Sequence, residues 1–238
     1  MHAPTYLLAK SDLLFVLRTT TPEGKVIILT LMVFSIFAWS VMASKAMQMR
    51  RAKRLNNLFE NEFKTQKRVL EVYDRQVQVP DCPLFMVYQE GCRELDGRLR
   101  IPGKETRRRF VSLKGMESVK RALERSVAQQ SLRLESGLIL LAIAVSGAPF
   151  LGLLGTVWGV MSAFSYVALA GKADLQTMAP GVAAALITTV AGLLVAIPSM
   201  FGYNWLVHNL RVLTVELDNF AQDLVSHIET EYVEDKDE

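Results

Sequence analysis

The amino-acid sequence predicts an all-α membrane protein with three transmembrane helices. Three stretches contain no Asp, Glu, Lys or Arg: 19 residues at 26–44, 36 residues at 136–171 and 36 residues at 175–210. About 20 apolar residues are enough for a helix to cross the hydrocarbon core of a bilayer. Half of all residues are hydrophobic, and the mean hydropathy is +0.21. Both values are high for a soluble chain of 238 residues.

The first span is expected at residues 26–44, after an N-terminal segment, 1–25, on the outer side of the membrane. Residues 5–18 are weakly amphipathic and suit the membrane–water interface. The sequence Thr-Pro-Glu-Gly at 21–24 is a helix-start signal. The apolar run is long for a signal peptide, and its basic cluster follows it rather than precedes it. We therefore expect a retained transmembrane helix.

Charge predicts the orientation of the chain. Five basic residues directly follow the first span: Lys45, Arg50, Arg51, Lys53 and Arg54. The positive-inside rule places this end in the cytoplasm and the N-terminus in the periplasm. The loop 45–136 carries 21 Lys plus Arg against 12 Asp plus Glu, whereas the tail 208–238 carries two against nine. Both are expected on the cytoplasmic side, either as solvated faces near anionic lipid or as surfaces that pair between subunits.

The cytoplasmic loop is expected to be helical, with breaks where proline and glycine gather. Residues 45–78 contain neither proline nor glycine, which predicts a helix leaving the membrane, and residues 84–95 are expected to form a short helix. The breaks are expected at 79–83, Gly97 and 101–103. From Glu105 to Ala148 there is no proline. A cytoplasmic helix is therefore expected to run directly into the second span, 137–165.

A short periplasmic loop, 166–178, is expected before the third span, 179–207, which should continue as a helix into the tail. Six apolar residues of this helix recur at alternating spacings of four and three: Leu206, Leu210, Leu213, Leu217, Phe220 and Leu224. Such a heptad seam predicts helix packing. The partner helices could belong to the same chain or to other copies in an oligomeric ring, and both alternatives stay open.

The sequence contains none of the common catalytic or metal-binding patterns. Cys82 and Cys92 are ten residues apart with no histidine nearby, so we expect free thiols rather than a zinc site. We find no nucleotide-binding glycine loop, no Ser/His/Asp set and no cysteine nucleophile with a base. The basic loop lacks interleaved aromatic residues, which argues against nucleic-acid binding. We expect a protein without enzymatic activity, cofactor or metal.

Small residues line one face of each of the last two spans. In the second span they include Gly152, Gly155 and Gly159, and in the third span Gly181, Ala185 and Gly192. Such faces let helix backbones approach closely in lipid. Prolines are expected to bend the spans at Pro149 and Pro198, whereas Pro180 suits the first turn of a helix.

Threonine hydroxyls lie near the middle of these small-residue faces: Thr156, Thr188 and Thr189. A threonine in a membrane helix often only bonds back to the carbonyl four residues earlier. Alternatively, hydroxyls on such a face can hold water or bind a partner helix. They cannot store a proton, and the usual intramembrane proton carrier is a carboxylate. None of the three spans contains one, so a partner would have to supply it.

Two motifs resemble the TolQ/ExbB proteins, which are relatives of the flagellar stator protein MotA. They are Gly-Ala-Pro-Phe-Leu-Gly-Leu-Leu-Gly-Thr-Val-Trp-Gly-Val-Met at 147–161 and Ala-Pro-Gly-Val-Ala-Ala-Ala-Leu-Ile-Thr-Thr-Val-Ala-Gly-Leu-Leu-Val-Ala-Ile-Pro at 179–198. The resemblance implies a proton-channel subunit of the bacterial inner membrane. It implies a pentamer around two single-span partners of the ExbD/TolR type, each with one membrane aspartate. Force would pass to a TonB- or TolA-like protein.

The family's functional threonines correspond to Thr156 and Thr189. The chain departs from the family at Ala184, where many members carry a glutamate, so the partner's aspartate is expected to be the proton carrier. Thr188 should matter less, because it lies about 100° around the helix from Thr189. Two alternatives remain: a flagellar-type stator, against which three spans argue because that type has four, and a non-conducting membrane scaffold. The sequence does not choose between a Tol–Pal and a TonB role.

Overall fold

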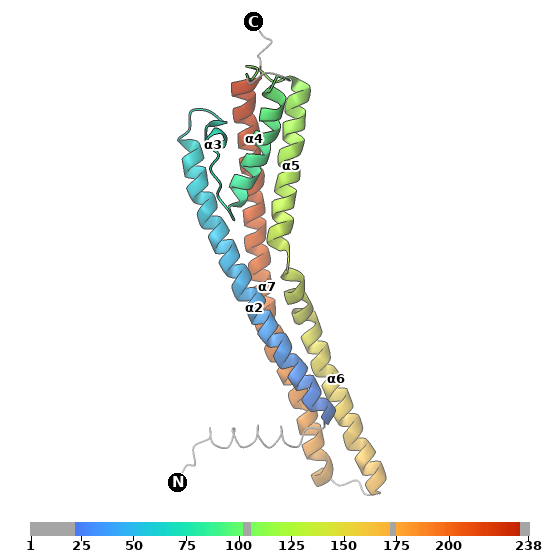
Figure 1. Ribbon diagram of the computed structural model, residues 1–238. Coiled ribbons are helices and arrows are strands. Elements are labelled where there is room, and N and C mark those ends of the chain that lie inside the picture. Colours follow the sequence, from blue (N-terminus) through green and yellow to red (C-terminus); the bar gives the residue numbers. More distant parts are fainter. Residues whose placement is uncertain (1–21, 102–105, 172–174, 234–238) are drawn as a thin grey trace, which may run out of the picture. The chain divides into compact units, whose positions relative to one another are not determined.

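The computed structural model describes residues 22–101, 106–171 and 175–233, and this part of the chain is helical apart from its connections (Figure 1). The helices are α2 (Pro22–Lys64), α3 (Glu71–Asp74), α4 (Pro83–Leu99), α5 (Leu113–Glu135), α6 (Leu138–Ala170) and α7 (Leu175–Tyr232). The interfacial segment expected at 5–18 lies outside the described residues.

Three of these helices are long and apolar enough to cross a membrane, namely α2, α6 and α7. This result confirms the number of spans that the uncharged stretches predicted. In the most apolar windows of the three helices, only 11%, 33% and 28% of the residues are buried within the chain. Large apolar side chains such as Phe37, Phe150 and Leu194 therefore face outward. A surface of this kind requires lipid or other protein around it.

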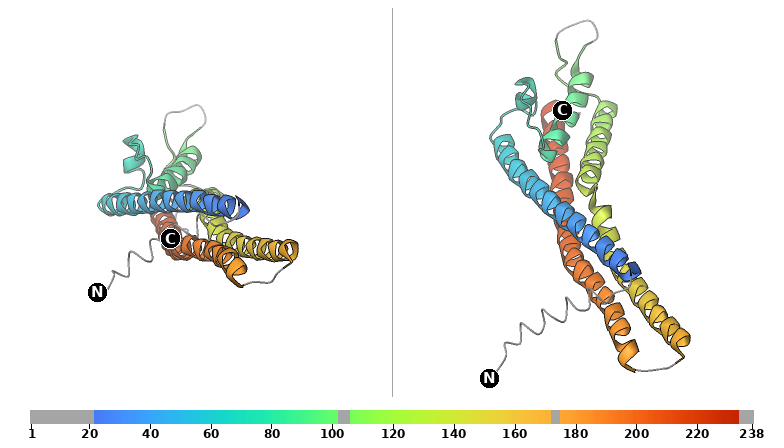
Figure 2. Two further views of the ribbon diagram at one scale, coloured as in Figure 1. Left: turned by 90° about the horizontal axis from the view of Figure 1, so that it is seen from below. Right: turned by 60° about the horizontal axis from the view of Figure 1, so that its bottom comes forward.

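The chain divides into two compact units. The span unit consists of the described residues up to Ser44 and those from Gly137 to Trp205, and the loop unit consists of residues from Lys45 to Ser136 and from Leu206 onward. In the span unit, α6 and the first part of α7 run side by side (Figures 1 and 2). The first part of α2 packs on them through a small cluster of Leu31, Ala148 and Ala196.

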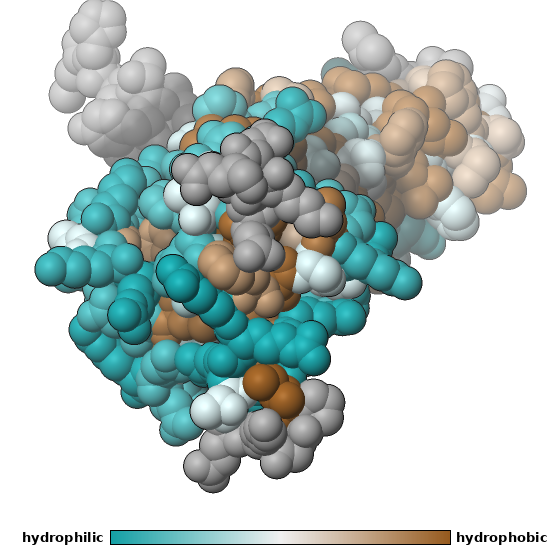
Figure 3. All heavy atoms as spheres, turned by 90° about the horizontal axis from the view of Figure 1, so that it is seen from above, coloured by the Kyte–Doolittle hydropathy of each residue, from teal (hydrophilic) through white to brown (hydrophobic). Residues whose placement is uncertain are grey.

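The loop unit has a dense aromatic core. The Phe59 ring from α2 lies 5.4 Å from that of Phe85 and 5.9 Å from that of Phe220, which belongs to α7. Tyr88 is fully buried, and its hydroxyl donates a hydrogen bond of 2.6 Å to the Val69 carbonyl. Outside this core, the surface seen in Figure 3 is mostly hydrophilic. The loop unit is therefore built like a water-soluble helical domain.

The expected short helix is present as α4, which begins at Pro83 as a proline at the first helical position should. Its first turn is capped from another helix, because the buried Asn56 Oδ1 of α2 accepts a hydrogen bond of 3.2 Å from the Leu84 amide. The break predicted at Gly97 is wrong, since α4 continues through it to Leu99. Gly97 is exposed, and a Cβ there would meet nothing within 4 Å, so no close contact requires a glycine at this position.

The predicted continuous helix into the second span is also wrong. Helix α5 begins only at Leu113, after the N-cap Ser112, and ends at Glu135. Gly137 then adopts φ 86°, a left-handed conformation that ends helices, and α6 starts at Leu138. The absence of proline was therefore a poor guide, because one glycine suffices to interrupt a helix. The predicted continuation of the third span is confirmed, since α7 runs unbroken from Leu175 to Tyr232.

The start of α7 differs from the expectation for Pro180. Because α7 begins at Leu175, Pro180 lies inside the helix rather than in its first turn. Pro149 and Pro198 also lie inside their helices. Each of these prolines lacks the N–H that would bond to the carbonyl four residues earlier.

The heptad seam of α7 is buried within the chain. All six of its members are at most 8% exposed: Leu206, Leu210, Leu213, Leu217, Phe220 and Leu224. Acidic residues near the end of α7 also pair with the loop of the same chain. The Lys120 ammonium lies 2.7 Å from the Glu229 carboxylate, and Glu231 accepts a 2.8 Å hydrogen bond from the Val69 amide. The seam and these charges thus serve intramolecular packing.

Candidate functional site at the threonine pair

Helices α6 and α7 approach so closely that their backbones touch at two glycines. A Cβ added to Gly152 would lie 2.9 Å from the Thr188 carbonyl oxygen, and one added to Gly192 would lie 2.6 Å from the Ala148 carbonyl oxygen. Real Cβ atoms do not approach backbone oxygens so closely. Only glycine fits at both positions.

Gly155, Gly159 and Gly181 extend this contact along the helices. A Cβ on Gly155 would collide with the Thr188 side chain, and one on Gly159 would lie 2.6 Å from the Ala185 Cβ. A Cβ on Gly181 would lie 3.2 Å from the Ala163 Cβ. The small-residue faces of the two spans therefore pack against each other within one chain. The sequence alone could not show which helix would cover them.

The hydroxyls of Thr156 and Thr189 meet between these helices and are in hydrogen-bond contact with each other. Each also lies within hydrogen-bonding distance of the Gly152 carbonyl oxygen, Thr156 Oγ1 at 3.0 Å and Thr189 Oγ1 at 3.1 Å. Both side chains are only half-buried. Both residues therefore keep part of their surface exposed.

Thr188 occupies a different environment. It is 1% exposed, and its hydroxyl donates a 2.6 Å hydrogen bond to the Ala185 carbonyl. Its side chain fills the space left by Gly155. Thr188 is therefore directed to the backbone of its own helix, and its smaller contribution to a path stays a prediction. Ala184, the position noted above for its departure from the family's glutamate, is also buried, at 3% exposure.

No charged side chain surrounds the threonine pair within the spans. The sequence has no Asp, Glu, Lys or Arg at 26–44, 137–171 or 175–205. In the described residues, no group of three or more His, Cys, Asp or Glu is placed to hold a metal ion. The site can exchange hydrogen bonds, but it has no group that can take up a proton at neutral pH.

The loop unit contains an ion-pair network that sequence reasoning missed. The buried Asp96 carboxylate receives Arg107 Nε at 2.6 Å and Arg100 Nε at 2.7 Å. Arg107 also forms a two-pronged pair with Asp74, at 2.7 and 2.9 Å. Hydrogen bonding to Arg107 lowers the pKa of Asp74 below its usual value. Only the spacing of Asp96 and Arg100, one helical turn apart, could have indicated part of this network.

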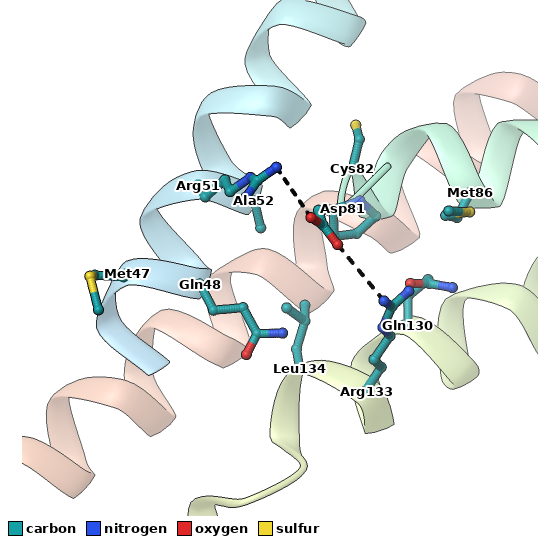
Figure 4. A pocket seen from close by; sticks show the side chains of 11 residues that line it. Met47, Gln48, Arg51, Ala52, Asp81, Cys82, Met86, Gln130, Arg133 and Leu134 are labelled. Atoms are coloured by element: carbon teal, nitrogen blue, oxygen red, sulfur yellow. Dashed lines mark ion pairs between the residues drawn. The ribbon is translucent and has the colours of Figure 1, made fainter. Parts of the chain in front are cut away.

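A cavity of about 260 Å³ lies in the loop unit between α2, α5 and the start of α4 (Figure 4). Arg51 and Arg133 point from two helices toward Asp81, at 3.3 and 3.8 Å. Cys82 lines the cavity. Burial raises the pKa of both the Cys82 and the Cys92 thiol. Both cysteines are free, as expected, and neither has the lowered pKa of a reactive thiol.

Comparison with known proteins places these features in a family. The sequence profile of the MotA/TolQ/ExbB proton channel family matches residues 94–219, which include Thr156, Thr188 and Thr189. The chain is 33% identical to the Tol-Pal system protein TolQ of Pseudomonas aeruginosa over 202 residues, 84% of each chain. It is 29% identical to the biopolymer transport protein ExbB of Neisseria meningitidis over 194 residues, 82% of this chain and 86% of the relative.

A shorter match is closer in sequence. Over 113 residues the chain is 42% identical to the biopolymer transport protein ExbB of Xanthomonas campestris pv. campestris, which is 48% of this chain and 45% of that protein. The profile match, the long relatives and the three apolar helices agree. The chain is a multi-pass membrane protein that belongs to the MotA/TolQ/ExbB proton channel family.

Proposed function

We propose that this chain is a proton-channel subunit of the bacterial inner membrane that uses the proton motive force to do mechanical work. The observation that carries the proposal is the half-buried pair of Thr156 and Thr189, placed between two spans that contain no charged residue. Membership of a proton channel family supports it.

The proton carrier belongs to a partner in this proposal. A hydroxyl has too high a pKa to store a proton, whereas an intramembrane aspartate can. The partner is a single-span protein of the ExbD/TolR type, whose aspartate faces the threonine pair. The work is delivered to a TonB- or TolA-like protein that reaches the outer membrane. The relatives named as Tol-Pal and as biopolymer transport proteins support both roles.

The functional unit is a ring of copies, a pentamer, embedded in lipid. The outward apolar side chains of the span unit support this assembly, because a monomer leaves most of each span uncovered by protein. In the proposed topology the N-terminus is periplasmic, and the loop 45–136 and tail 208–238 are cytoplasmic. The small glycine faces do not form the contacts between copies, because they are already filled within the chain.

A non-conducting scaffold is the second candidate. The close α6–α7 contact favours it, because Thr156, Thr188 and Thr189 all make hydrogen bonds within the helix pair. A flagellar-type stator receives less support, because the part of the chain that the structure describes has three candidate spans rather than four.

Proton flux into liposomes separates channel from scaffold. The chain is reconstituted with an ExbD/TolR-type partner, with the same partner carrying Asp→Asn, and alone. We expect flux only with the unmodified partner, and a strong but incomplete reduction of that flux in Thr156→Val and Thr189→Val. Ser165→Ala is the matched control, because Ser165 is an exposed residue of α6 whose hydroxyl donates to the Met161 carbonyl of its own helix. Full flux in both threonine variants would leave the hydroxyls with a purely structural role.

A further inference from the structure

The three oxygens of the threonine pair and Gly152 have fewer hydrogens than contacts. Thr156 Oγ1, Thr189 Oγ1 and the Gly152 carbonyl oxygen form a triangle in which every pair is within hydrogen-bonding distance. Each hydroxyl carries one hydrogen, and the carbonyl carries none. Two hydrogens must therefore serve three contacts.

Only two arrangements place a hydrogen between the two hydroxyls. Either Thr156 donates to Thr189, which donates to Gly152, or Thr189 donates to Thr156, which donates to Gly152. If both hydroxyls donated to the carbonyl, the two hydroxyl oxygens would face each other with no hydrogen between them, which is repulsive at contact distance. In both favourable arrangements each hydroxyl hydrogen is used inside the triangle.

We propose that the Thr156–Thr189 pair is a binding site that only accepts hydrogen bonds. It binds a protonated carboxylic acid and does not pass the proton through its own hydroxyls. The pair offers only lone pairs to an incoming group, so that group must bring the hydrogen. A carboxylate would have to draw a hydrogen away from the Gly152 carbonyl. A relay is also excluded, because the hydroxyl chain ends on a backbone carbonyl that has no proton to release. This inference rests on the proposed function and specifies the form of the partner carboxyl that the site selects.

Few titratable side chains share the span unit with the pair. Helices α2, α6 and α7 pack in the span unit, and their described residues there include four titratable side chains: Glu23, Lys25, Tyr166 and Tyr203. Tyr166 and Tyr203 are ten and 14 residues from the nearer threonine, so they lie about 15 and 21 Å away along their helices. Glu23 and Lys25 lie at the start of α2, just before Ile27, which packs in a cluster with Leu151 and Ala191.

Thr188 is not part of this binding site. Its hydrogen is directed to the Ala185 carbonyl at 2.6 Å, whereas its contact with the Gly152 carbonyl is longer, 3.2 Å. It is also buried against α6. Thr188 thus supplies a matched control from the neighbouring position of the same helix.

The hydrogen count is testable on the chain alone. Labelling with carbonyl-¹³C glycine and ¹⁵N leucine gives signals only from three peptide bonds: Gly137–Leu138, Gly152–Leu153 and Gly192–Leu193. In the proposed triangle the Gly152 carbonyl receives one hydroxyl hydrogen. Thr156→Val and Thr189→Val each leave one hydroxyl to donate directly, so the Gly152 carbonyl shift should stay close to that of the unmodified chain. The double variant should move it.

A graded response would overturn the proposal, because a single variant that moved the signal halfway would mean that both hydroxyls donate to the carbonyl. An unmoved signal in the double variant would overturn it as well. The Gly137 and Gly192 signals report whether each variant has folded, and Thr188→Val should behave like the unmodified chain. None of these measurements needs a partner, so they decide the hydrogen count even if the proposed function fails.

The direction in which the pH dependence of flux shifts is an independent test of the proposal. Flux with the ExbD/TolR-type partner should fall at high pH, where its carboxyl loses the proton. An acceptor stabilises the protonated form, so removing one in Thr156→Val or Thr189→Val should move this fall to lower pH, by up to about one pH unit for one ordinary hydrogen bond. A shift to higher pH, or none, would show that the hydroxyls do not favour the protonated acid. Absence of partner-dependent flux at every pH in the unmodified chain would instead contradict the proposed function.

Discussion

At the scale of single residues, the loop unit depends on one buried charge. The Asp96 carboxylate has both oxygens occupied by arginines, and Arg107 extends the network to Asp74. Asp96 lies in α4 and Arg107 lies beyond its end, so these bonds fasten the segment after α4 to the helix. A network of this kind resists change because each member satisfies another.

Asp96→Ala should destabilise the loop unit by about 1–3 kcal/mol, because it removes the buried acceptor of Arg100 Nε and Arg107 Nε. The matched control is Glu94→Ala in the same helix, at a partly exposed ion pair with Arg98 that contributes about 0–1 kcal/mol. Thermal unfolding followed by circular dichroism in detergent measures both. Equal losses in the two variants would contradict a special role for burial at Asp96.

The same network predicts a dependence on pH. Pairing with Arg107 lowers the pKa of folded Asp74, so the folded state holds this carboxylate more firmly in its charged form. The resulting stability is present above the ordinary aspartate pKa, about 3.9, and is lost as pH falls through the lower folded value. The melting temperature should therefore fall on acidification below about pH 4. Arg107→Lys, which keeps the charge but loses the two-pronged bond, should reduce this slope.

At the scale of helices, glycine decides how α6 and α7 pack. Gly155→Leu should destabilise the span unit by about 1–3 kcal/mol, because the added side chain overlaps Thr188 in a contact that has no free space. Gly147→Leu is the control, since a Cβ added at this position of the same helix meets nothing within 4 Å. Unfolding of the two variants in the same detergent compares them directly. A Gly155→Leu protein as stable as Gly147→Leu would mean that the helices do not meet at this face.

At the scale of the whole molecule, the orientation of the spans is open to a direct test. Reporter fusions at positions 4, 90, 173 and 232 should read periplasm, cytoplasm, periplasm and cytoplasm, because the five basic residues at 45–54 favour the cytoplasm. The fusion at position 232 is the most informative of the four, because the charge of the acidic tail does not favour the cytoplasmic side on which it is expected. A periplasmic signal at 90 would reverse the whole arrangement.

The sequence predicted the spans correctly because hydropathy sums over many residues, so no single position decides it. The end of α5 was mispredicted because it depends on one residue, Gly137, whose left-handed conformation is not visible in an otherwise helical pattern. Thr156 and Thr189 were predicted as site residues, but the hydrogen bond between their hydroxyls was not predicted. The network at Asp96 was missed because Arg107 and Asp74 reach it from distant parts of the loop.

The unbroken helices α2 and α7 have a consequence for insertions and deletions. The chain passes from one unit to the other three times. Two of these passages lie within α2 and α7, and the other lies at Gly137, between α5 and α6. A residue inserted in a continuous helix turns everything after it by about 100° and advances it by about 1.5 Å. One alanine inserted between Trp205 and Leu206 would thus turn the heptad seam by about 100° relative to the residues before it in the same helix. A residue inserted beside Gly137 would lie outside both α5 and α6, so length variation should be tolerated better at that junction than within α2 or α7.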